Sequence, residues 1–165
     1  MKLLTLIRHA KSSHSHLGLA DIERPLNARG IAAVELMGDV LKQQDFSCDA
    51  VFCSPAARAQ ETANGLFNGT PLSDKLRTEP DLYTFDMEAL YRFIELIDTG
   101  INHAFIVAHN PAITLLTNDL AFSGIDNLPT CGIVRIKLAI EDWFDIAAGT
   151  GEMIDFDCPR NHRTD

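Results

Sequence analysis

The segment Leu4–Ser13, with the sequence LTLIRHAKSS, joins a short apolar run to two residues that rarely end a buried strand. We predict a β-strand over Leu3–Ile7, because branched apolar residues dominate this run and its length suits one strand. Arg8 and His9 follow it directly. Arginine and histidine are poor core residues, so the pattern indicates that both are used at the end of this strand.

Strand patterns alternate with helical patterns along most of the chain, which is typical of βαβ units. The expected strands are Leu3–Ile7, Ala50–Cys53 and Ala104–Ala108, and the expected helices run from Asn27 to about Leu41, Pro55 to about Leu66, Met87 to Ile97 and Pro111 to about Leu120. This order predicts an α/β fold with a mostly parallel central sheet covered on both faces.

The end of the chain shows a different pattern. Gly132–Leu138 and Trp143–Ala147 are expected to form two strands of a hairpin, with the turn at Glu141-Asp142. The tail from Gly149 to Asp165 has few apolar residues, and we expect it to be loosely ordered. A length of 165 residues predicts a single domain over residues 1–165.

Composition and charge argue against several classes of protein. Hydrophobic residues make up 46% and charged residues 22% of the chain, as in globular proteins. The formal net charge of -9 argues against a nucleic-acid partner, because phosphate backbones require a basic surface. The segment before Arg8 is too short for a signal peptide and no apolar run reaches membrane-spanning length, so we expect a cytoplasmic protein with no membrane partner. The four cysteines form no CxxC pair and are expected to be free thiols.

Three strand-to-helix junctions carry the residues best suited to chemistry. The first strand ends in Arg8 and His9, the second leads through Ser54 to Arg58, and the third ends in His109. Ligands of parallel sheets bind beyond the carboxyl ends of the strands, so we expect these side chains to converge there. Two guanidinium groups and two imidazoles fit a phosphate group, to which helix N-termini add N–H donors. One imidazole can attack phosphorus while the other donates to an oxygen. A nucleotide P-loop is not expected, since no GxxxxGK[ST] motif is present.

Leu6–Ser12 and four later segments match, in order, the motifs of one protein family. The later segments are Glu23–Gly30, Ser54–Ala63, Val107–Pro111 and Leu128–Thr130. Together they resemble the histidine phosphatase superfamily, the phosphoglycerate mutase-like proteins, and within it the small SixA-type phosphohistidine phosphatases. The resemblance covers roughly residues 1 to 147 and implies a three-layer α/β/α fold of the phosphoglycerate mutase-like type.

The resemblance also implies roles for the four residues at the junctions. His9 would be the nucleophile that becomes phosphorylated, while Arg8, Arg58 and His109 would bind the phosphate and His109 would donate to its oxygens. Neither a metal nor another cofactor is expected, because the arginines can stabilise the charge of the transition state. The third signature position, often glycine in the family, is Ala10, and we expect little consequence from this small change.

The sequence leaves the general acid open. Larger members of the family use a carboxylic acid to protonate the leaving oxygen. Glu79 and Asp81 are candidates here, although either could be an ordinary solvated loop acid, and His14 and Asp21 are weaker candidates. An alkoxide leaving group needs a proton, whereas the imidazole of a phosphohistidine can leave neutral if its other nitrogen is already protonated. A site without a firm acid therefore favours phosphohistidine over sugar-phosphate esters.

These observations predict a phosphatase that acts on phosphohistidine in a protein, with a phosphotransfer-type domain as the partner. The alternative is a small-molecule phosphomonoesterase that uses the same pocket with Glu79 or Asp81 as general acid. A non-catalytic phosphate-binding adaptor is disfavoured, because all four pocket residues are present. His14 and His16 lie two residues apart in an extended segment, but without a third ligand nearby we do not expect them to bind a metal.

Overall fold

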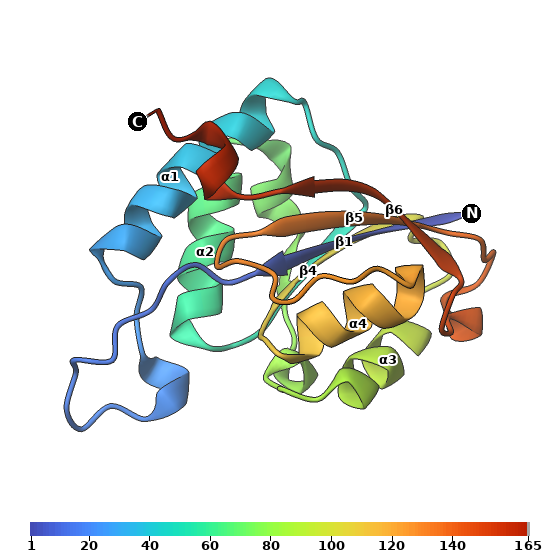
Figure 1. Cartoon of the computed structure of the whole chain (residues 1–165), viewed down its shortest axis with the longest axis horizontal. Helices are drawn as coiled ribbons and strands as arrows, with labels where there is room; N and C mark the ends of the chain where they lie inside the picture. Colours follow the sequence, from blue (N-terminus) through green and yellow to red (C-terminus); the bar gives the residue numbers. More distant parts are fainter. Residues whose placement is uncertain (165) are drawn as a thin grey trace.

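The computed structural model describes residues 1–164 and places a six-stranded sheet between two layers of helices (Figure 1). In chain order the elements are β1 (Lys2–Arg8), α1 (Ala28–Gln43), β2 (Ala50–Cys53), α2 (Ala57–Phe67), β3 (Leu76–Thr78), α3 (Met87–Glu95), β4 (His103–Ala108), α4 (Ala112–Ala121), β5 (Ile133–Leu138) and β6 (Gly151–Asp157). The strand order is β3-β2-β4-β1-β5-β6, and β5 is antiparallel to both of its neighbours. The predicted three-layer fold with a mostly parallel sheet is confirmed. Over residues 1–164, no helix is both long and apolar enough to cross a membrane.

The prediction of a strand over Trp143–Ala147 is wrong. Trp143–Asp145 forms a 3₁₀ helix, and the Asp142 side chain accepts a hydrogen bond from Phe144 N at its start. Trp143 is buried, and its Nε1 donates to the carbonyl oxygen of Ile101 at 2.7 Å. The indole needs both an apolar site and an acceptor, and a single helical turn supplies them where an edge strand would expose one face.

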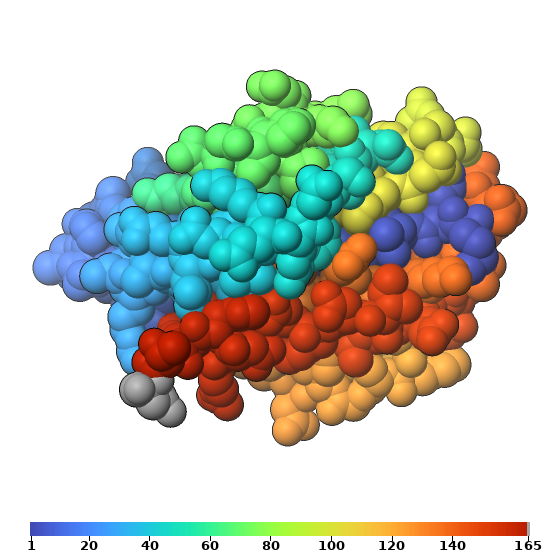
Figure 2. All heavy atoms as spheres, turned by 90° about the horizontal axis from the view of Figure 1, so that it is seen from above, coloured from blue at the N-terminus to red at the C-terminus, as the bar shows by residue number. Residues whose placement is uncertain are grey.

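The strand that pairs with β5 on the side away from β1 is β6. It lies in the tail that the sequence predicts to be loosely ordered. That expectation is wrong for residues 151–162, which form β6 and a 3₁₀ helix over Pro159–His162. Backbone pairing with β5 satisfies the peptide groups of β6, so an edge strand can form with few apolar side chains. Figure 2 shows this C-terminal segment, in red, lying along α1, which the 3₁₀ helix contacts.

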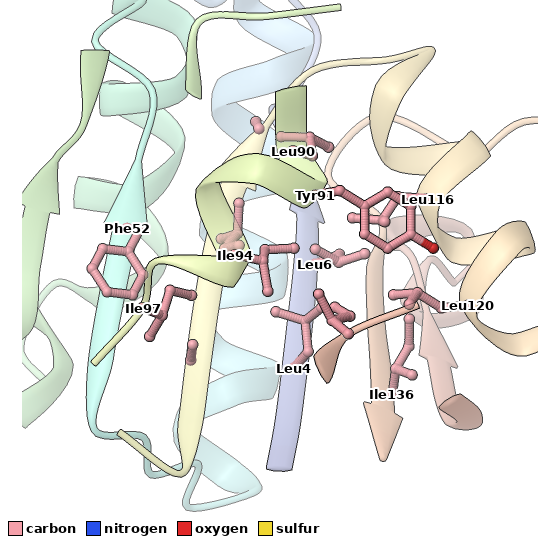
Figure 3. Close-up of a cluster of buried hydrophobic side chains, with 14 of the residues drawn as sticks. Leu4, Leu6, Phe52, Leu90, Tyr91, Ile94, Ile97, Leu116, Leu120 and Ile136 are labelled. Atoms are coloured by element: carbon pink, nitrogen blue, oxygen red, sulfur yellow. The ribbon is translucent and has the colours of Figure 1, made fainter. Parts of the chain in front are cut away.

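Two hydrophobic cores lie on opposite faces of the sheet. In β1, Leu4 and Leu6 belong to the core under α3 and α4, whereas Ile7 belongs to the core under α1 and α2. Alternate residues of a strand point to opposite faces, which explains this division. Figure 3 shows the first core, where Leu90 and Ile94 of α3 pack over the strands. The four cysteines are buried free thiols, as expected. Because both faces are packed, the sheet is a rigid support for the side chains at its edges.

The start of α1 holds the loop that follows β1. The Asn27 side chain caps the helix by accepting from Gly30 N at 2.9 Å, and Asn27 N donates to Lys11 O at 3.0 Å. A Cβ at position 30 would lie 2.1 Å from Lys11 O, so only glycine permits this approach. The expected start of the helix at Asn27 is thus confirmed, and the contact fixes the chain just after His9.

Candidate active site

Parallel pairing brings the three junctions to one edge of the sheet. β4 lies between β1 and β2, with Arg8 opposite Ala108 and Cys53 opposite Val107. The backbone pairing continues one residue further, since His9 N donates to the carbonyl oxygen of Ala108 at 3.2 Å. The residues that follow these three strands therefore meet at the carboxyl edge, as the sequence predicts.

His9 is held as a neutral imidazole with one nitrogen available as a base. Its Nδ1 lies 2.7 Å from Ala10 O, an acceptor, and its Nε2 accepts from Arg58 Nε at 3.3 Å. Because an arginine nitrogen can only donate, these contacts require a proton on Nδ1 and a lone pair on Nε2. Burial, together with the positive charges of Arg58 and Arg8, lowers the pKa of His9 to about 4. The ring is therefore neutral at pH 7 and carries a nucleophilic lone pair.

Arg58 projects from the first turn of α2 and is only 1% exposed. Its Nη1 donates to the backbone oxygen of Asp21 at 2.7 Å and its Nη2 to Asp21 Oδ2 at 3.0 Å. Thr62, one turn later, accepts from Ala10 N at 2.9 Å and donates to Arg58 O at 2.7 Å. These bonds fix α2 to the signature loop. Ala10 is buried without a positive φ, so alanine causes no backbone strain at this position.

His109 follows β4 and lies beside His9, with 5.1 Å between the ring centroids. Its Nε2 lies 2.7 Å from Ser54 Oγ, and Ser54 Oγ accepts from Ala56 N at 3.2 Å. With the ring proton on Nδ1, His109 Nε2 can accept the Ser54 hydroxyl hydrogen. Nδ1 is buried and has no partner in the described chain. Burial, together with the neighbouring His9 and the positive charge of Arg58, lowers the pKa of His109 to about 3.

Arg8 completes the set of four residues predicted from the junctions. Its Nη1 donates to the carbonyl oxygen of Leu128 at 2.7 Å, which ties it to the loop before β5. Its Nε is buried and unpaired with any described residue. Buried polar atoms in proteins nearly always have a partner, and Arg8 Nε and His109 Nδ1 are two donors suited to an incoming anion.

Asp21, a weak candidate from the sequence, lies in this site. Its carboxylate accepts from Arg58 Nη2, from Arg24 Nε at 3.0 Å and from the Tyr83 hydroxyl. The Tyr83 hydrogen bond, followed by those of the two arginines, holds the pKa of Asp21 well below its usual range. A carboxylate in this state has no proton to donate. The Tyr83 ring packs edge-on against His109, with centroids 5.6 Å apart.

Sequence reasoning missed Arg24 and Tyr83. Asp21 lies just before the Glu23–Gly30 motif and Arg24 lies within it, and their spacing of three residues is a signal that could have indicated their ion pair. No local pattern marks Tyr83, because its place depends on how the loop before α3 folds back across the sheet edge.

Glu79 and Asp81 are not brought to this cluster. Both line a hollow beside β2 and α3 with Phe52, Arg77 and Phe93. In the described part of the chain, no side-chain hydrogen bond or ion pair joins either carboxylate to the four junction residues. Their loop instead reaches the site through Tyr83.

The paired histidines after the signature are separate from the junction residues. His14 Nδ1 lies 3.3 Å from Arg24 Nη1, and His16 Nδ1 lies 3.0 Å from Ser13 Oγ. Among residues 1–164, no three His, Cys, Asp or Glu side chains cluster closely enough to hold a metal ion. The site itself combines three arginines, two imidazoles and one carboxylate, and the arginines favour an anion.

Comparisons with known proteins agree with this arrangement. The family model for the histidine phosphatase superfamily (branch 1) matches residues 4–92. An uncharacterized protein of Mycobacterium tuberculosis is 31% identical over 164 residues, which cover 93% of this chain and 100% of the relative.

Solved structures of the same fold include two with named activities. The protein histidine phosphatase SixA complexed with tungstate has a TM-score of 0.80 at 22% identity, over 98% of this chain and 99% of that one. The alpha-ribazole phosphatase from Shigella flexneri has a TM-score of 0.71 at 19% identity, over 95% and 96% of the two chains. Both therefore share the arrangement of strands that places the junction residues at one edge.

Proposed function

Because the chain belongs to the histidine phosphatase superfamily and is a phosphatase of that type, we propose that it hydrolyses phosphohistidine in a protein. The observation that carries the proposal is the pairing of a neutral, buried His9 with Arg58 in a site that contains no protonated carboxylic acid among its described residues. The proposed partner is a protein that presents a phosphohistidine, such as a phosphotransfer-type domain, and the proposed location is the cytoplasm.

The first step is attack by His9 on phosphorus. The Nε2 lone pair forms a P–N bond while the bond between phosphorus and the substrate nitrogen breaks. Arg58 Nε, which donates to Nε2 in the free site, donates to a phosphoryl oxygen instead. Arg8 and the Nδ1–H of His109 donate to the other oxygens, where negative charge develops. Water then attacks the phosphorus on His9, releasing phosphate and restoring the lone pair.

The leaving group decides between substrate classes. A sugar or alcohol leaving group departs as an alkoxide and needs a general acid, whereas an imidazole with its other nitrogen protonated departs neutral. Asp21 is ionised, and Glu79 and Asp81 lie outside the cluster of junction residues. The site is consequently better suited to a phosphoramidate than to a phosphate ester. Similarity to the SixA structure supports the same choice, although the alpha-ribazole phosphatase shares the fold.

A substrate panel tests the proposal. A protein phosphorylated on histidine, p-nitrophenyl phosphate and several sugar phosphates are offered at equal concentration, and initial rates of phosphate release are compared. We expect kcat/KM for the phosphohistidine protein to exceed that for the esters by about 10²-fold or more, since general acid catalysis contributes about this much to ester cleavage. Faster hydrolysis of sugar phosphates would refute the proposal and favour the phosphomonoesterase alternative.

A matched variant tests the nucleophile. His9→Ala should abolish turnover and the labelled enzyme that a rapid alkaline denaturing quench captures from wild type. His16→Ala serves as the control, because His16 lies in the following loop and its ring hydrogen-bonds to Ser13 rather than to any of the four junction residues. Full activity in His9→Ala would show that His9 is not the nucleophile.

A further inference from the structure

The Arg58 guanidinium has two edges, and different groups occupy them. Nη1 and Nη2 form the end edge, which Asp21 engages through its backbone oxygen at 2.7 Å and its carboxylate at 3.0 Å. Nε lies on the side edge and points at His9 Nε2, 3.3 Å away. The planar Arg58 side chain therefore aligns His9 Nε2, which would attack phosphorus, with the N–H groups that would donate to the phosphoryl oxygens.

We propose that Asp21 is a positioning residue, which holds the end edge of Arg58 so that the side edge faces the phosphoryl group beside His9. The inference rests on the phosphatase activity of the chain but not on the identity of the leaving group. Asp21 takes no proton and forms no bond to substrate in this role.

Arg58 needs such an anchor because its side chain is long and its guanidinium reaches the site from α2. Two charge-assisted contacts on one edge fix the plane of the group, whereas a single contact would leave it free to rotate. Asp21 supplies both contacts from one residue, one through the backbone and one through the carboxylate. Arg58 is 1% exposed, so water competes little for these donors.

The arrangement lets substrate bind without rearranging Arg58. As a phosphoryl group enters, Nε exchanges His9 Nε2 for a phosphoryl oxygen, and the second hydrogen of Nη2 on the same edge can bind another oxygen. This exchange frees the His9 lone pair at the moment that the electrophile arrives. The contacts of Nη1 and Nη2 with Asp21 on the end edge remain in place throughout.

Asp21 is itself held from two sides. Arg24 Nε donates to Oδ1 at 3.0 Å, and the Tyr83 hydroxyl donates to Oδ2, the oxygen that also binds Arg58. The Tyr83 ring packs against His109. Tyr83 thus connects the carboxylate that orients Arg58 with the imidazole on the other side of the pocket.

The test compares Asp21→Asn with Glu23→Gln. Both remove one negative charge from the same 3₁₀ turn, but within residues 1–164 the Glu23 side chain accepts only from Ala20 N, at 3.1 Å. We expect Asp21→Asn to lower kcat by about 10- to 100-fold and to change KM by less than about 3-fold, because a misaligned Arg58 still attracts the phosphate but fits the transition state less well. Glu23→Gln should keep kcat within about 2-fold of wild type. Thermal unfolding of each variant checks that it is folded.

Tyr83→Phe keeps the ring against His109 and removes only the hydroxyl that binds Asp21. It should lower kcat by about 2- to 5-fold with KM unchanged, the loss expected for one hydrogen bond. Wild-type kcat in Asp21→Asn or in Tyr83→Phe, an equal loss in Glu23→Gln, or an effect on KM alone would overturn the proposal. Rates are measured on whichever phosphorylated substrate wild type hydrolyses fastest, so the result stands even if phosphohistidine is not that substrate.

Discussion

The two ends of β4 carry two histidines in similar surroundings but with different partners. Burial lowers the pKa of His103 at the start of the strand to about 4, and that of His109 just after its end to about 3. The His103 ring has Thr5 Oγ1 at 2.9 Å from Nε2. His109 has Ser54 on one nitrogen, no described partner on the other, and the ring of His9 beside it.

The comparison of His103 with His109 shows that a lowered pKa does not by itself identify a functional histidine. At the amino edge of the sheet the polar groups satisfy one another: Lys2 Nζ donates to the carbonyl oxygens of Thr99 and Ile101, and the Asp49 carboxylate accepts from the backbone of Asn102 and His103. Such a completed network stabilises the fold. At the carboxyl edge, Arg8 Nε and His109 Nδ1 are buried without a partner in the described chain, so this edge keeps polar atoms available for an incoming group.

The largest effect that separates the two ends should be in activity. His109→Phe removes both ring nitrogens from the proposed phosphate site while keeping a ring of similar size, and we expect kcat/KM to fall by about 10²- to 10⁴-fold. His103→Phe should keep kcat/KM within about 2-fold, since it lies at the opposite edge of the sheet. Steady-state rates on the best wild-type substrate provide the measurement. Equal losses in the two variants would contradict the division of roles along β4.

Stability should show the reverse order with a smaller effect. His103→Phe leaves the buried Thr5 Oγ1 without its partner, so we expect the free energy of unfolding to fall by about 1–3 kcal/mol. His109→Phe breaks the hydrogen bond to Ser54, and we expect a smaller fall in the free energy of unfolding, of about 1 kcal/mol. Urea unfolding of the two variants beside wild type measures both values. A larger loss in His109→Phe would mean that His109 is the more important structural residue.

Much of the site follows from the sequence because parallel strands impose it. Once β1, β2 and β4 are predicted as parallel neighbours, Arg8, His9, Arg58 and His109 must lie at one edge, and the structure places them there. The roles of these residues stay predictions until the variants are measured. Their meeting at one edge required no knowledge of side-chain contacts.

The parts that the sequence does not predict lie where no periodic pattern operates. Asp21, which the sequence names only as a weak candidate for the general acid, belongs to a 3₁₀ turn, and Tyr83 belongs to an irregular loop. Their positions depend on tertiary contacts that a local pattern cannot encode. The wrong prediction of a strand over Trp143–Ala147 has a related cause. The apolar residues around Trp143 suggested an edge strand, but the indole is buried through a 3₁₀ turn, and backbone pairing forms β6 from a segment with few apolar residues.

The smallest difference between the two ends concerns the dependence of stability on pH, in which they should behave alike. His9, His103 and His109 have pKa values of about 4, 4 and 3 in the folded chain, below the ordinary value of 6.5. Between pH 6.5 and about pH 4 the histidines of the unfolded chain bind protons that those of the folded chain do not. The free energy of unfolding is therefore highest above pH 6.5 and falls as the pH decreases toward 4, by up to about 1.4 kcal/mol per pH unit for each histidine.

Replacing either histidine of β4 with phenylalanine should remove one proton from this linkage. We expect the slope of unfolding free energy between pH 7 and pH 5 to decrease by about 1 kcal/mol per pH unit or less, and by similar amounts in His103→Phe and His109→Phe. Urea titrations at pH 7, 6 and 5 measure the slopes. A slope that changes in only one variant would show that the other histidine is already protonated in the folded protein. If the two variants change the slope equally but differ in activity, burial sets the charge of both rings. The difference in activity then comes from the partners of His109.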